Sequence, residues 1–438
     1  LRKAARDGMP AWIQGQLPRC KRRARPPRAD RRDLILPKLQ KVLDRRYIVH
    51  KPDPEDIKSL TDYFDVPKDK DIRMVYNGTS CGLNEAVWAP GFWLPTPRSA
   101  TRLLDYNYYS VDIDLGEMFL NFPLPEVLKR YSGIDLTPFS DDLAPDQQLE
   151  RFWARWERCW MGLCPSPFMA VRFYYFAEEF GRRNRKDPAN ALRWDEIKMN
   201  LPGDALFDPT KPRVMKWDSL AKRIAGDIVA FIDDLRASGF SQEQAWAIAR
   251  QITSRLQYFG IQDAPRKRRP PVLDPGAWAG AIFSTKDHTI SQTVSQKKWD
   301  KAKGQLKEIK LMIGPVETPA LLPYKRLEQI RGFLCHLAMT FEIITPFLKG
   351  LHLTLASHLP RRDDEGWKLN DRQWEVYLYQ GVEDGRFTLE EIESALDPDT
   401  SDPTPPPTLI LPVPRLAQDI DALLAIMSSE TPPLVILR

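Results

Sequence analysis

The stretch Phe231-Ile232-Asp233-Asp234 decides how the rest of this chain is interpreted. The apolar residues 228–230 precede it and Leu235 follows it, a pattern typical of two short strands joined by a tight turn. Two adjacent aspartates between apolar strands bring like charges together, which is costly unless a divalent cation offsets the repulsion. Taken alone, the tetrad is more typical of an exposed turn than of a metal site.

A second acidic stretch lies upstream, where residues 111–119 read Val-Asp-Ile-Asp-Leu-Gly-Glu-Met-Phe. We expect a buried strand over 108–115, followed by a turn that brings in Phe119. Nucleotidyl transfer needs carboxylates from separate strands to hold two magnesium ions. Asp114 is the first candidate ligand in this stretch, and Asp112 is the competing candidate, whose alternative role is that of an outward-facing carboxylate.

The bulk composition is that of a globular protein. The 438 residues suffice for two or three domains, with 42% hydrophobic and 28% charged residues. No stretch approaches the roughly 20 apolar residues of a membrane span, and the charged N-terminus lacks the apolar segment of a signal peptide. We therefore expect an intracellular protein of the cytoplasm or nucleus, without a membrane partner. Because the chain starts at Leu1, we expect it to be part of a longer product.

Charge and cysteine patterns narrow the function classes. The net charge is +5, and basic residues cluster at 19–28 and 266–269, which favours contact with a phosphate backbone; a solvated tail and loop are the alternative. The five cysteines form no CxxC pair, which argues against a disulfide framework or a zinc site and predicts reduced thiols.

The periodicity of apolar residues predicts a mixed order of helices and antiparallel strands without a βαβ repeat, and thus an α+β fold. The sequence indicates strands at 63–66, 72–76, 108–115 and 278–284. It indicates helices at 34–47, 166–180, 241–258, 296–355 and 416–427.

With these motifs in place, the chain resembles the polymerase domain of a retroelement reverse transcriptase. Residues 114–124 resemble the first palm motif, Met-Gly-Leu-Cys-Pro-Ser-Pro-Phe at 161–168 the second, and the tetrad at 231–234 the third. Upstream, residues 66–84 resemble the fingers motif that grips a triphosphate. Downstream, Gly260 and the basic run resemble the fourth palm motif, and Trp278-Ala279-Gly280 resembles the primer-grip hairpin.

The resemblance implies a right-hand polymerase with fingers, a palm of antiparallel sheet packed on helices, and a helical thumb. On this basis we expect residues 1–33 to be a basic leader or linker and 34–290 to form fingers and palm, with an insertion at about 183–217. We expect 291–396 to form a helical thumb and connection, and 397–438 a proline-rich spacer and C-terminal tail. No four-carboxylate ribonuclease H pattern follows the thumb.

The resemblance also assigns roles. Asp114, Asp233 and Asp234 would be the catalytic carboxylates and would bind two Mg²⁺ ions, with Mn²⁺ as a possible substitute. Six further residues would contact substrates. Lys68 and Arg73 would contact the triphosphate, and Phe119 would exclude a 2′-hydroxyl. Gly162 and Ser166 would shape the nucleotide pocket or serve only as helix-start residues. Lys267 would protonate pyrophosphate, with Arg266 and Arg268 as alternatives.

The function implied is RNA-directed DNA polymerisation by a mobile element, with an RNA or DNA template, a primer strand and dNTPs as partners. A catalytically degenerate relic that only binds nucleic acid is the alternative. An RNA-dependent RNA polymerase is disfavoured because those enzymes usually carry a smaller polar residue at the position of Phe119. The sequence does not indicate an oligomeric state.

Overall fold

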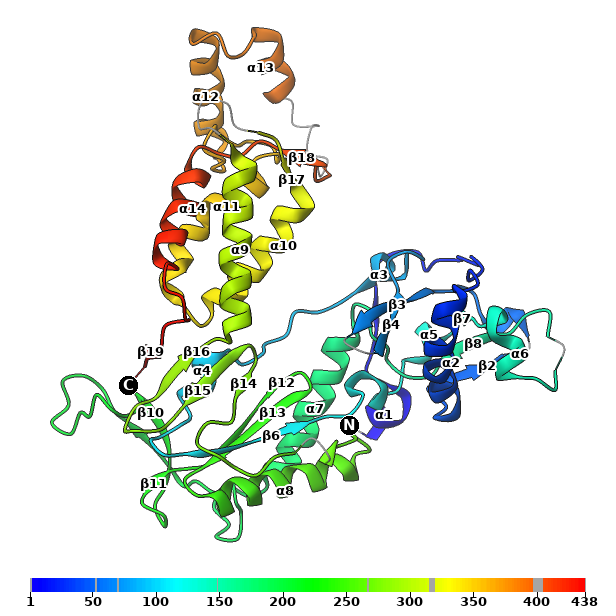
Figure 1. Cartoon of the computed structure of the whole chain (residues 1–438), viewed down its shortest axis with the longest axis vertical. Helices are drawn as coiled ribbons and strands as arrows, with labels where there is room; N and C mark the ends of the chain where they lie inside the picture. The colour runs from blue at the N-terminus through cyan, green and yellow to red at the C-terminus, as the bar shows by residue number, and fades with distance from the viewer. Residues whose placement is uncertain are drawn as a thin grey trace. The chain divides into compact units, whose positions relative to one another are not determined.

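The structure is a computed structural model that describes residues 2–51, 53–68, 71–147, 149–265, 268–314, 320–396 and 405–437. In these ranges helices are interspersed with strands, and the paired strands of every sheet are antiparallel (Figure 1). This confirms the predicted mixture of helices and sheet. The chain divides into two units, Leu1–Pro95 with Leu103–Leu273, and Thr96–Arg102 with Asp274–Arg438. Among the described residues, no helix is long and apolar enough to cross a membrane.

The first unit is organised around a three-stranded sheet in the order β12-β13-β6, made of Asp227–Phe231, Asp234–Gly239 and Tyr109–Asp114. One face of the sheet carries Ile113, Ile228 and Leu235, all buried in a single core. Strand residues alternate between the two faces, so the acidic residues of β6 and β13 lie on the other face. The apolar face therefore packs into this core, and the opposite face carries Asp112, Asp114 and Asp234.

Two long helices pack beside this sheet, α7 (Ser166–Arg182) and α8 (Gln242–Tyr258), as Figure 1 shows. Helix α7 begins at a Pro-Ser-Pro sequence, where the fixed proline backbone angle suits a first turn. Helix α8 begins where the Ser241 side chain accepts a hydrogen bond from the Gln244 amide at 3.1 Å. It ends at Tyr258, two residues before Gly260, whose positive φ of 78° is typical of the position after a helix end. Both helices lie where the sequence predicts them.

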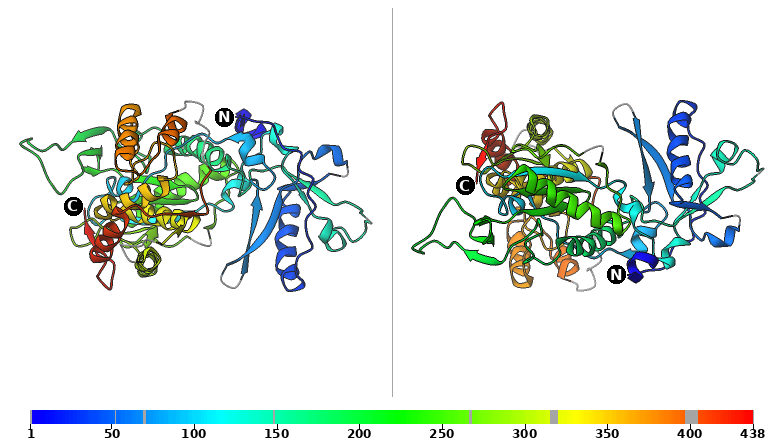
Figure 2. Two further views of the ribbon diagram at one scale, coloured as in Figure 1. Left: turned by 90° about the horizontal axis from the view of Figure 1, so that it is seen from above. Right: turned by 90° about the horizontal axis from the view of Figure 1, so that it is seen from below.

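A β-hairpin of β3 (Asp62–Lys68) and β4 (Asp71–Asn77) packs beside helix α2 (Ala29–Asp44), as both views of Figure 2 show. The helix begins before the predicted residue 34. It also ends before the predicted residue 47, because Arg46 takes a positive φ of 54° and the chain turns into β2 (Ile48–His50). Strand β2 pairs with β8 (Trp153–Trp156), which also pairs with β7 (Gly133–Asp135).

The segment predicted as an insertion folds as a sheet of its own. Strands β9 (Glu196–Met199), β10 (Val214–Asp218) and β11 (Arg223–Ile224) pair in the order β11-β10-β9. The other elements of the first unit are short: α1 (Arg2–Asp7), β1 (Trp12–Ile13), α3 (Leu83–Ala86), β5 (Val87–Trp88), α5 (Glu126–Lys129) and α6 (Ser140–Leu143), with 3₁₀ turns η1 (Pro54–Asp56), η2 (Met118–Asn121) and η3 (Thr137–Phe139).

The segment of the second unit that starts at Asp274 begins with a hairpin, whereas apolar periodicity predicts one strand over 278–284. Ala279 and Gly280 both have positive φ, 46° and 88°, so the chain reverses between β14 (Ala277–Trp278) and β15 (Ala281–Ser284). Strand β15 continues the sheet to β16 (Ser291–Thr293), which pairs with β19 (Val435–Ile436).

Helices α9 (Gln296–Ile313), α10 (Tyr324–Ala338), α11 (Lys349–Ala356) and α14 (Arg415–Ile426) of the second unit share an apolar core. Its members include Leu416, Ile420 and Leu423 of α14, which lies in the range predicted as a spacer and tail. This part of 397–438 is therefore a core helix, while residues 397–404 lie outside the described ranges. The remaining elements are α4 (Pro97–Thr101), β17 (Leu322–Pro323), η5 (Glu342–Leu348), α12 (Asp371–Glu383), α13 (Leu389–Leu396) and β18 (Leu409–Ile410).

Candidate active site

Two of the predicted carboxylates face each other across neighbouring strands. Asp234, the first residue of β13, is the register partner of Asp114, the last residue of β6. Side chains directly opposite in an antiparallel pair lie on the same face of the sheet, with Cβ atoms about 5 Å apart. The fold thus brings together Asp114 and Asp234, which are 120 positions apart in the sequence and lie at one end of the sheet.

The third carboxylate, Asp233, lies in the turn between β12 and β13. The turn also contains Ile232, whose positive φ of 58° is uncommon for a β-branched residue and costs about 1–3 kcal/mol. A backbone hydrogen bond of 3.0 Å from the Leu115 amide to the Asp233 carbonyl joins this turn to the end of β6. Asp233 and Asp234 are both exposed. The strained turn therefore presents adjacent carboxylates next to Asp114.

Asp112, the competing candidate, has a partner of its own. The Arg236 guanidinium donates to both of its carboxylate oxygens, from Nε at 2.7 Å and from Nη2 at 3.0 Å. Arg236 is only 3% exposed, so the ion pair also neutralises a buried charge of the sheet. This assignment of Asp112 to a structural pair favours Asp114 as the ligand candidate.

The turn after Asp114 is held by a hydrogen-bond network that the sequence gives no reason to expect. Glu117 has a positive φ of 54° and accepts hydrogen bonds from Arg45 at 2.5 Å, from Tyr47 at 2.8 Å and from Lys41. Burial alone would raise the pKa of Glu117, but these hydrogen bonds and the two positive charges lower it overall. The carboxylate thus ties helix α2 and its C-terminal end to the Asp114–Phe119 turn.

A second set of contacts joins the same turn to the end of α8. The Gly116 backbone N–H donates to the Gln262 backbone carbonyl at 2.9 Å, and the Gln262 backbone N–H donates to Asn121 Oδ1 at 3.1 Å. The Gln262 side chain also donates to the Tyr47 hydroxyl at 2.8 Å. Phe119 lies on this turn, half-buried against the core of the first unit. Its position is therefore fixed from two sides.

Gly162 lies against strand β4 of the β3–β4 hairpin. It has a φ of 107°, and a Cβ atom there would lie 1.8 Å from the Tyr76 carbonyl oxygen, so no side chain fits. The Asn84 side chain donates to the Gly162 carbonyl at 2.9 Å and accepts from the Cys164 amide at 2.9 Å. These contacts connect two segments that both belong to the predicted motifs.

Ser166 belongs to the same predicted motif as Gly162 but is placed differently. It is the first residue of α7 and is fully buried, with 0% exposure. A residue without exposed surface does not line a substrate pocket in this conformation. The geometry therefore favours the alternative role of Ser166, that of a helix-start residue.

Lys68 and Arg73 lie on one face of the β3–β4 hairpin. The register pairs Arg73 with Val66, two residues before Lys68, so the two cations are diagonal neighbours. Both side chains are exposed, and among the described residues neither is in an ion pair. This part of the prediction is compatible with binding a polyanion such as a triphosphate.

Of the three basic residues predicted as proton donors after α8, the structure describes Arg268. Lys267 and Arg266 lie outside the described residues. Arg268 forms an ion pair with Asp263, whose side chain is only 2% exposed. This partner gives Arg268 a structural role.

A buried ionic cluster supports the start of β12. Arg182 donates to Asp227 at 2.7 Å, to Glu178 at 2.7 Å and to the Ile228 carbonyl at 2.9 Å. Lys216 also contacts Asp227, at 2.5 Å. Burial would raise the pKa of Asp227, but the two cations lower it overall. The strand that leads to the Asp233 turn is thus fixed to α7.

The carboxylate donors have the chemistry that magnesium prefers, but only two of them are paired in the sheet register. Carboxylate oxygens are the ligands that Mg²⁺ prefers, and Asp114 and Asp234 share one face and one end of the sheet. In the described part of the chain, however, no three His, Cys, Asp or Glu side chains are gathered into a group that could hold a metal ion. The carboxylates are therefore adjacent but not assembled into a closed metal site.

Among known proteins, this chain is similar to solved structures. No family model and no curated protein matches this chain. The chain is similar to a foamy viral protease-reverse transcriptase, solved in complex with double-stranded DNA. The sequence identity is 15%, the match covers 87% of this chain and 52% of that chain, and the TM-score is 0.49. This chain thus spans about half the length of the viral protein that it matches.

Proposed function

We propose that this chain is an RNA-directed DNA polymerase of a mobile element, which extends a primer 3′-hydroxyl with dNTPs. The observation that carries the proposal is the pairing of Asp114 with Asp234 across β6 and β13, next to the Asp233 turn. Carboxylates from separate strands at one end of a sheet are what nucleotidyl transfer requires. The primer oxygen attacks the α-phosphate, the bond to the β-phosphate breaks, and pyrophosphate leaves.

In this proposal Asp114, Asp233 and Asp234 hold two magnesium ions, or manganese in their place. When bound, the ions supply activation of the primer hydroxyl and neutralisation of the triphosphate charge. Lys68 and Arg73 contact the β- and γ-phosphates from the β3–β4 hairpin. Lys267 remains the proposed donor of a proton to pyrophosphate.

The proposed architecture is a right hand. Residues 34–290 form fingers and palm, with β6, β12 and β13 as the palm sheet and α7 and α8 behind it. Residues 291–396 form the helical thumb and connection. Template and primer bind this hand as an RNA–DNA or DNA–DNA duplex.

Phe119 selects the sugar. A ring fixed on the turn after Asp114 fills the space that a 2′-hydroxyl would need, so the enzyme uses dNTPs. The network around Glu117 and Gln262 keeps this turn, and therefore the ring, in one position.

Primer extension on poly(rA)/oligo(dT) with dTTP and Mg²⁺ tests the proposal. Wild-type protein should extend the primer, and extension should stop when EDTA removes the metal. A preparation that binds the template–primer but adds no nucleotide in Mg²⁺ or Mn²⁺ would overturn the proposed activity.

A second function is favoured by one observation. Among the described residues, the carboxylates are not gathered into a group that could hold a metal ion. A catalytically degenerate protein that only binds nucleic acid would have this feature. The two functions differ in the assay above, because the second predicts binding of template–primer without extension.

A further inference from the structure

Strand β9 forms the edge of the small sheet that lies in the predicted insertion. In the order β11-β10-β9 it pairs with β10 alone, within the part of the chain that the structure describes. A strand that pairs on one side only presents a row of backbone N–H and C=O groups on its other side, and such a row is a template for a further strand. The proposed chemistry makes no use of this edge.

The hydrogen bonds to β10 show which backbone groups face the free edge. The Asn200 N–H, directly after β9, donates to the Arg213 carbonyl at 2.8 Å. Hydrogen-bonded and non-hydrogen-bonded positions alternate along an antiparallel pair, so Lys198 also faces β10, and Ile197 and Met199 face away from it. The backbone groups of Ile197 and Met199 are therefore the ones that a second strand would meet.

The side chains at this edge are apolar and exposed. Ile197 is 51% exposed, Met199 is 56% exposed, and Val214, the register partner of Met199, is 53% exposed. Ile197 and Met199 are two positions apart, so they lie on one face of the sheet together with Val214. Exposed large apolar side chains in the same segment are also Leu201, Leu206, Phe207 and Leu220. Exposed apolar residues gathered in this way mark an interaction site.

The charged residues of β9 lie on the opposite face of the sheet. The Glu196 carboxylate and the Lys198 ammonium are 4.0 Å apart, and both side chains are partly exposed. Glu196 also accepts a hydrogen bond from the Ser219 hydroxyl at 2.9 Å, and Lys198 lies over the Trp217 ring, 3.7 Å from its centroid. The strand thus carries one acidic and one basic residue on either side of Ile197.

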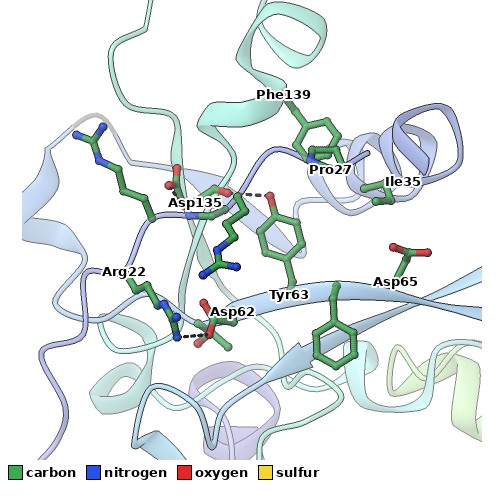
Figure 3. A pocket seen from close by; sticks show the side chains of 13 residues that line it. Arg22, Pro27, Ile35, Asp62, Tyr63, Asp65, Asp135 and Phe139 are labelled. Atoms are coloured by element: carbon green, nitrogen blue, oxygen red, sulfur yellow. Dashed lines mark hydrogen bonds and ion pairs between the residues drawn. The ribbon is translucent and has the colours of Figure 1, made fainter. Parts of the chain in front are cut away.

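Strand β3 is also an edge strand, but the chain itself supplies partners for it. The basic segment at residues 19–28 lies against it, where the Leu60 N–H donates to the Cys20 carbonyl at 2.6 Å. Arg22 lies 3.8 Å from Asp62 of this strand, as the dashed line in Figure 3 marks. Strand β9 has no such second neighbour in its sheet, among the strands that the structure describes. A strand that completes its edge would therefore come from another molecule.

A second copy of this chain complements the edge. When two β9 strands pair in antiparallel fashion about a two-fold axis, Ile197 of one copy lies opposite Ile197 of the other. Glu196 then lies opposite Lys198 of the second copy, and Lys198 opposite Glu196. Apolar pairs and pairs of opposite charge are both favourable across strands. Pairing centred on Lys198 would instead bring two lysines together, so charge selects the register that is centred on Ile197.

We infer that β9 is a self-association surface, on which a second copy of this chain pairs to form one sheet with three strands from each copy. The two Ile197 side chains meet on the axis, and Met199 and Val214 flank them. The usual guard of an edge strand, an exposed lysine, is cancelled here because Lys198 meets Glu196 of the second copy. The inference goes beyond the proposed polymerase activity and does not rest on it.

Sedimentation equilibrium of the full chain measures the association. Wild type should change from monomer at about 1 µM to dimer at about 100 µM, the range of a weak complex. Ile197→Arg places two like charges on the axis and should weaken dimerisation on the order of 100-fold. Ile343→Arg is the matched control, because Ile343 is equally an exposed isoleucine but lies in η5 of the second unit, and it should dimerise like wild type. Wild type that stays monomeric at the highest concentration, or Ile197→Arg that dimerises like wild type, would overturn the inference.

Exchange of charges tests the register. Glu196→Lys and Lys198→Glu should each stay monomeric, because each places like charges opposite one another in both cross-strand pairs. An equimolar mixture of the two variants should dimerise, since every pair then joins a lysine to a glutamate. The double variant Glu196→Lys/Lys198→Glu should dimerise as wild type does. A mixture that associates no more than either variant alone refutes this pairing of the strands.

Cross-linking gives a readout that does not depend on a charged substitution. Opposite residues of a hydrogen-bonded antiparallel pair have Cα atoms about 5.5 Å apart, a separation that a disulfide spans. Ile197→Cys treated with diamide should therefore form a covalent dimer that dithiothreitol reverses. Ile343→Cys should give no more dimer than wild type, whose own free cysteines set the background. Equal cross-linking of the two cysteine variants would contradict the proposed axis.

Primer extension by the same preparations keeps the two proposals apart, because β9 contains none of the residues proposed for the active site. If the chain dimerises through β9 but extends no primer, the polymerase proposal fails and the self-association surface stands. If the chain extends primers and remains monomeric at every concentration, the polymerase proposal stands and the self-association surface fails.

Discussion

Arg236 of β13 donates two hydrogen bonds to Asp112 of β6, two residues along the strands from the Asp114–Asp234 pair. The two aspartates of one strand thus have different surroundings. Asp112 neutralises an almost fully buried arginine, whereas Asp114 lies at the strand end beside the Asp233 turn. We therefore expect Asp112 to contribute to stability and Asp114 to contribute to activity.

The substitutions Asp112→Asn and Asp114→Asn should therefore affect different properties, the first stability and the second activity. Asp112→Asn should lower the free energy of unfolding by about 1–2 kcal/mol, because Arg236 loses its charged partner. The loss is no larger because the Asp112 side chain is 40% exposed and solvent weakens the ion pair. Asp114→Asn should leave stability within about 0.5 kcal/mol and lower the rate of dTTP incorporation on the order of 1,000-fold. Urea denaturation and primer extension measure the two effects. A catalytic loss confined to Asp112→Asn would reverse the assignment.

Gly162 should not tolerate a side chain. Gly162→Ala places a methyl group against the Tyr76 carbonyl oxygen and should cost about 3 kcal/mol or more in unfolding free energy. Gly260→Ala is the control, because Gly260 also has a positive φ, but nothing lies within 4 Å of its added Cβ. It should cost only about 1–2 kcal/mol. Similar unfolding free energies for the two variants would argue against the close contact.

Glu117→Gln should destabilise the protein in a pH-dependent way. The folded-state pKa of Glu117 lies below its ordinary value of 4.5, so its contribution is fully present above pH 4.5 and is lost as the pH falls through the folded pKa. At neutral pH the variant should lose about 1–2 kcal/mol, and the difference from wild type should shrink at low pH. Thermal unfolding at several pH values measures this. Glu126→Gln, which removes a largely exposed carboxylate, should change stability by less than about 0.5 kcal/mol.

Phe119→Val should relax the choice of sugar. A smaller side chain opens space for a 2′-hydroxyl, so the ratio of rate to KM for rUTP relative to dTTP should rise on the order of 100-fold. Single-nucleotide incorporation with each substrate measures the ratio. Glu117→Gln should shift it in the same direction but less, because the turn loosens while the ring remains. Equal use of rUTP and dTTP by wild type would refute the gate and revive an RNA polymerase assignment.

The sequence predicted the elements whose stability depends on local pattern. Strands β6, β12 and β13 and helices α7 and α8 have clear apolar periodicity and end signals such as Ser241 and Gly260, so their positions follow from short stretches. The proximity of Asp114 and Asp234 came only through the family resemblance, because strand register is a long-range property.

Other features could not be predicted because distant contacts create them. The basic segment is fixed by hydrogen bonds to Leu60 and Asp135, which nothing in its own composition indicates. Glu117 is a charged residue between apolar neighbours, which is a weak signal on its own, and its partners come from α2 and the chain after it. Ser166 shows the opposite case, since a position within a matching motif proved to be fully buried.

The most direct test of the central claim is primer extension by Asp233→Asn beside wild type, under single-turnover conditions with dTTP, Mg²⁺ and poly(rA)/oligo(dT). The account predicts that wild type adds dTMP and that the variant is slower on the order of 1,000-fold, while its affinity for the template–primer is unchanged. Extension by Asp233→Asn at the wild-type rate would contradict the assignment of this carboxylate and with it the proposed active site.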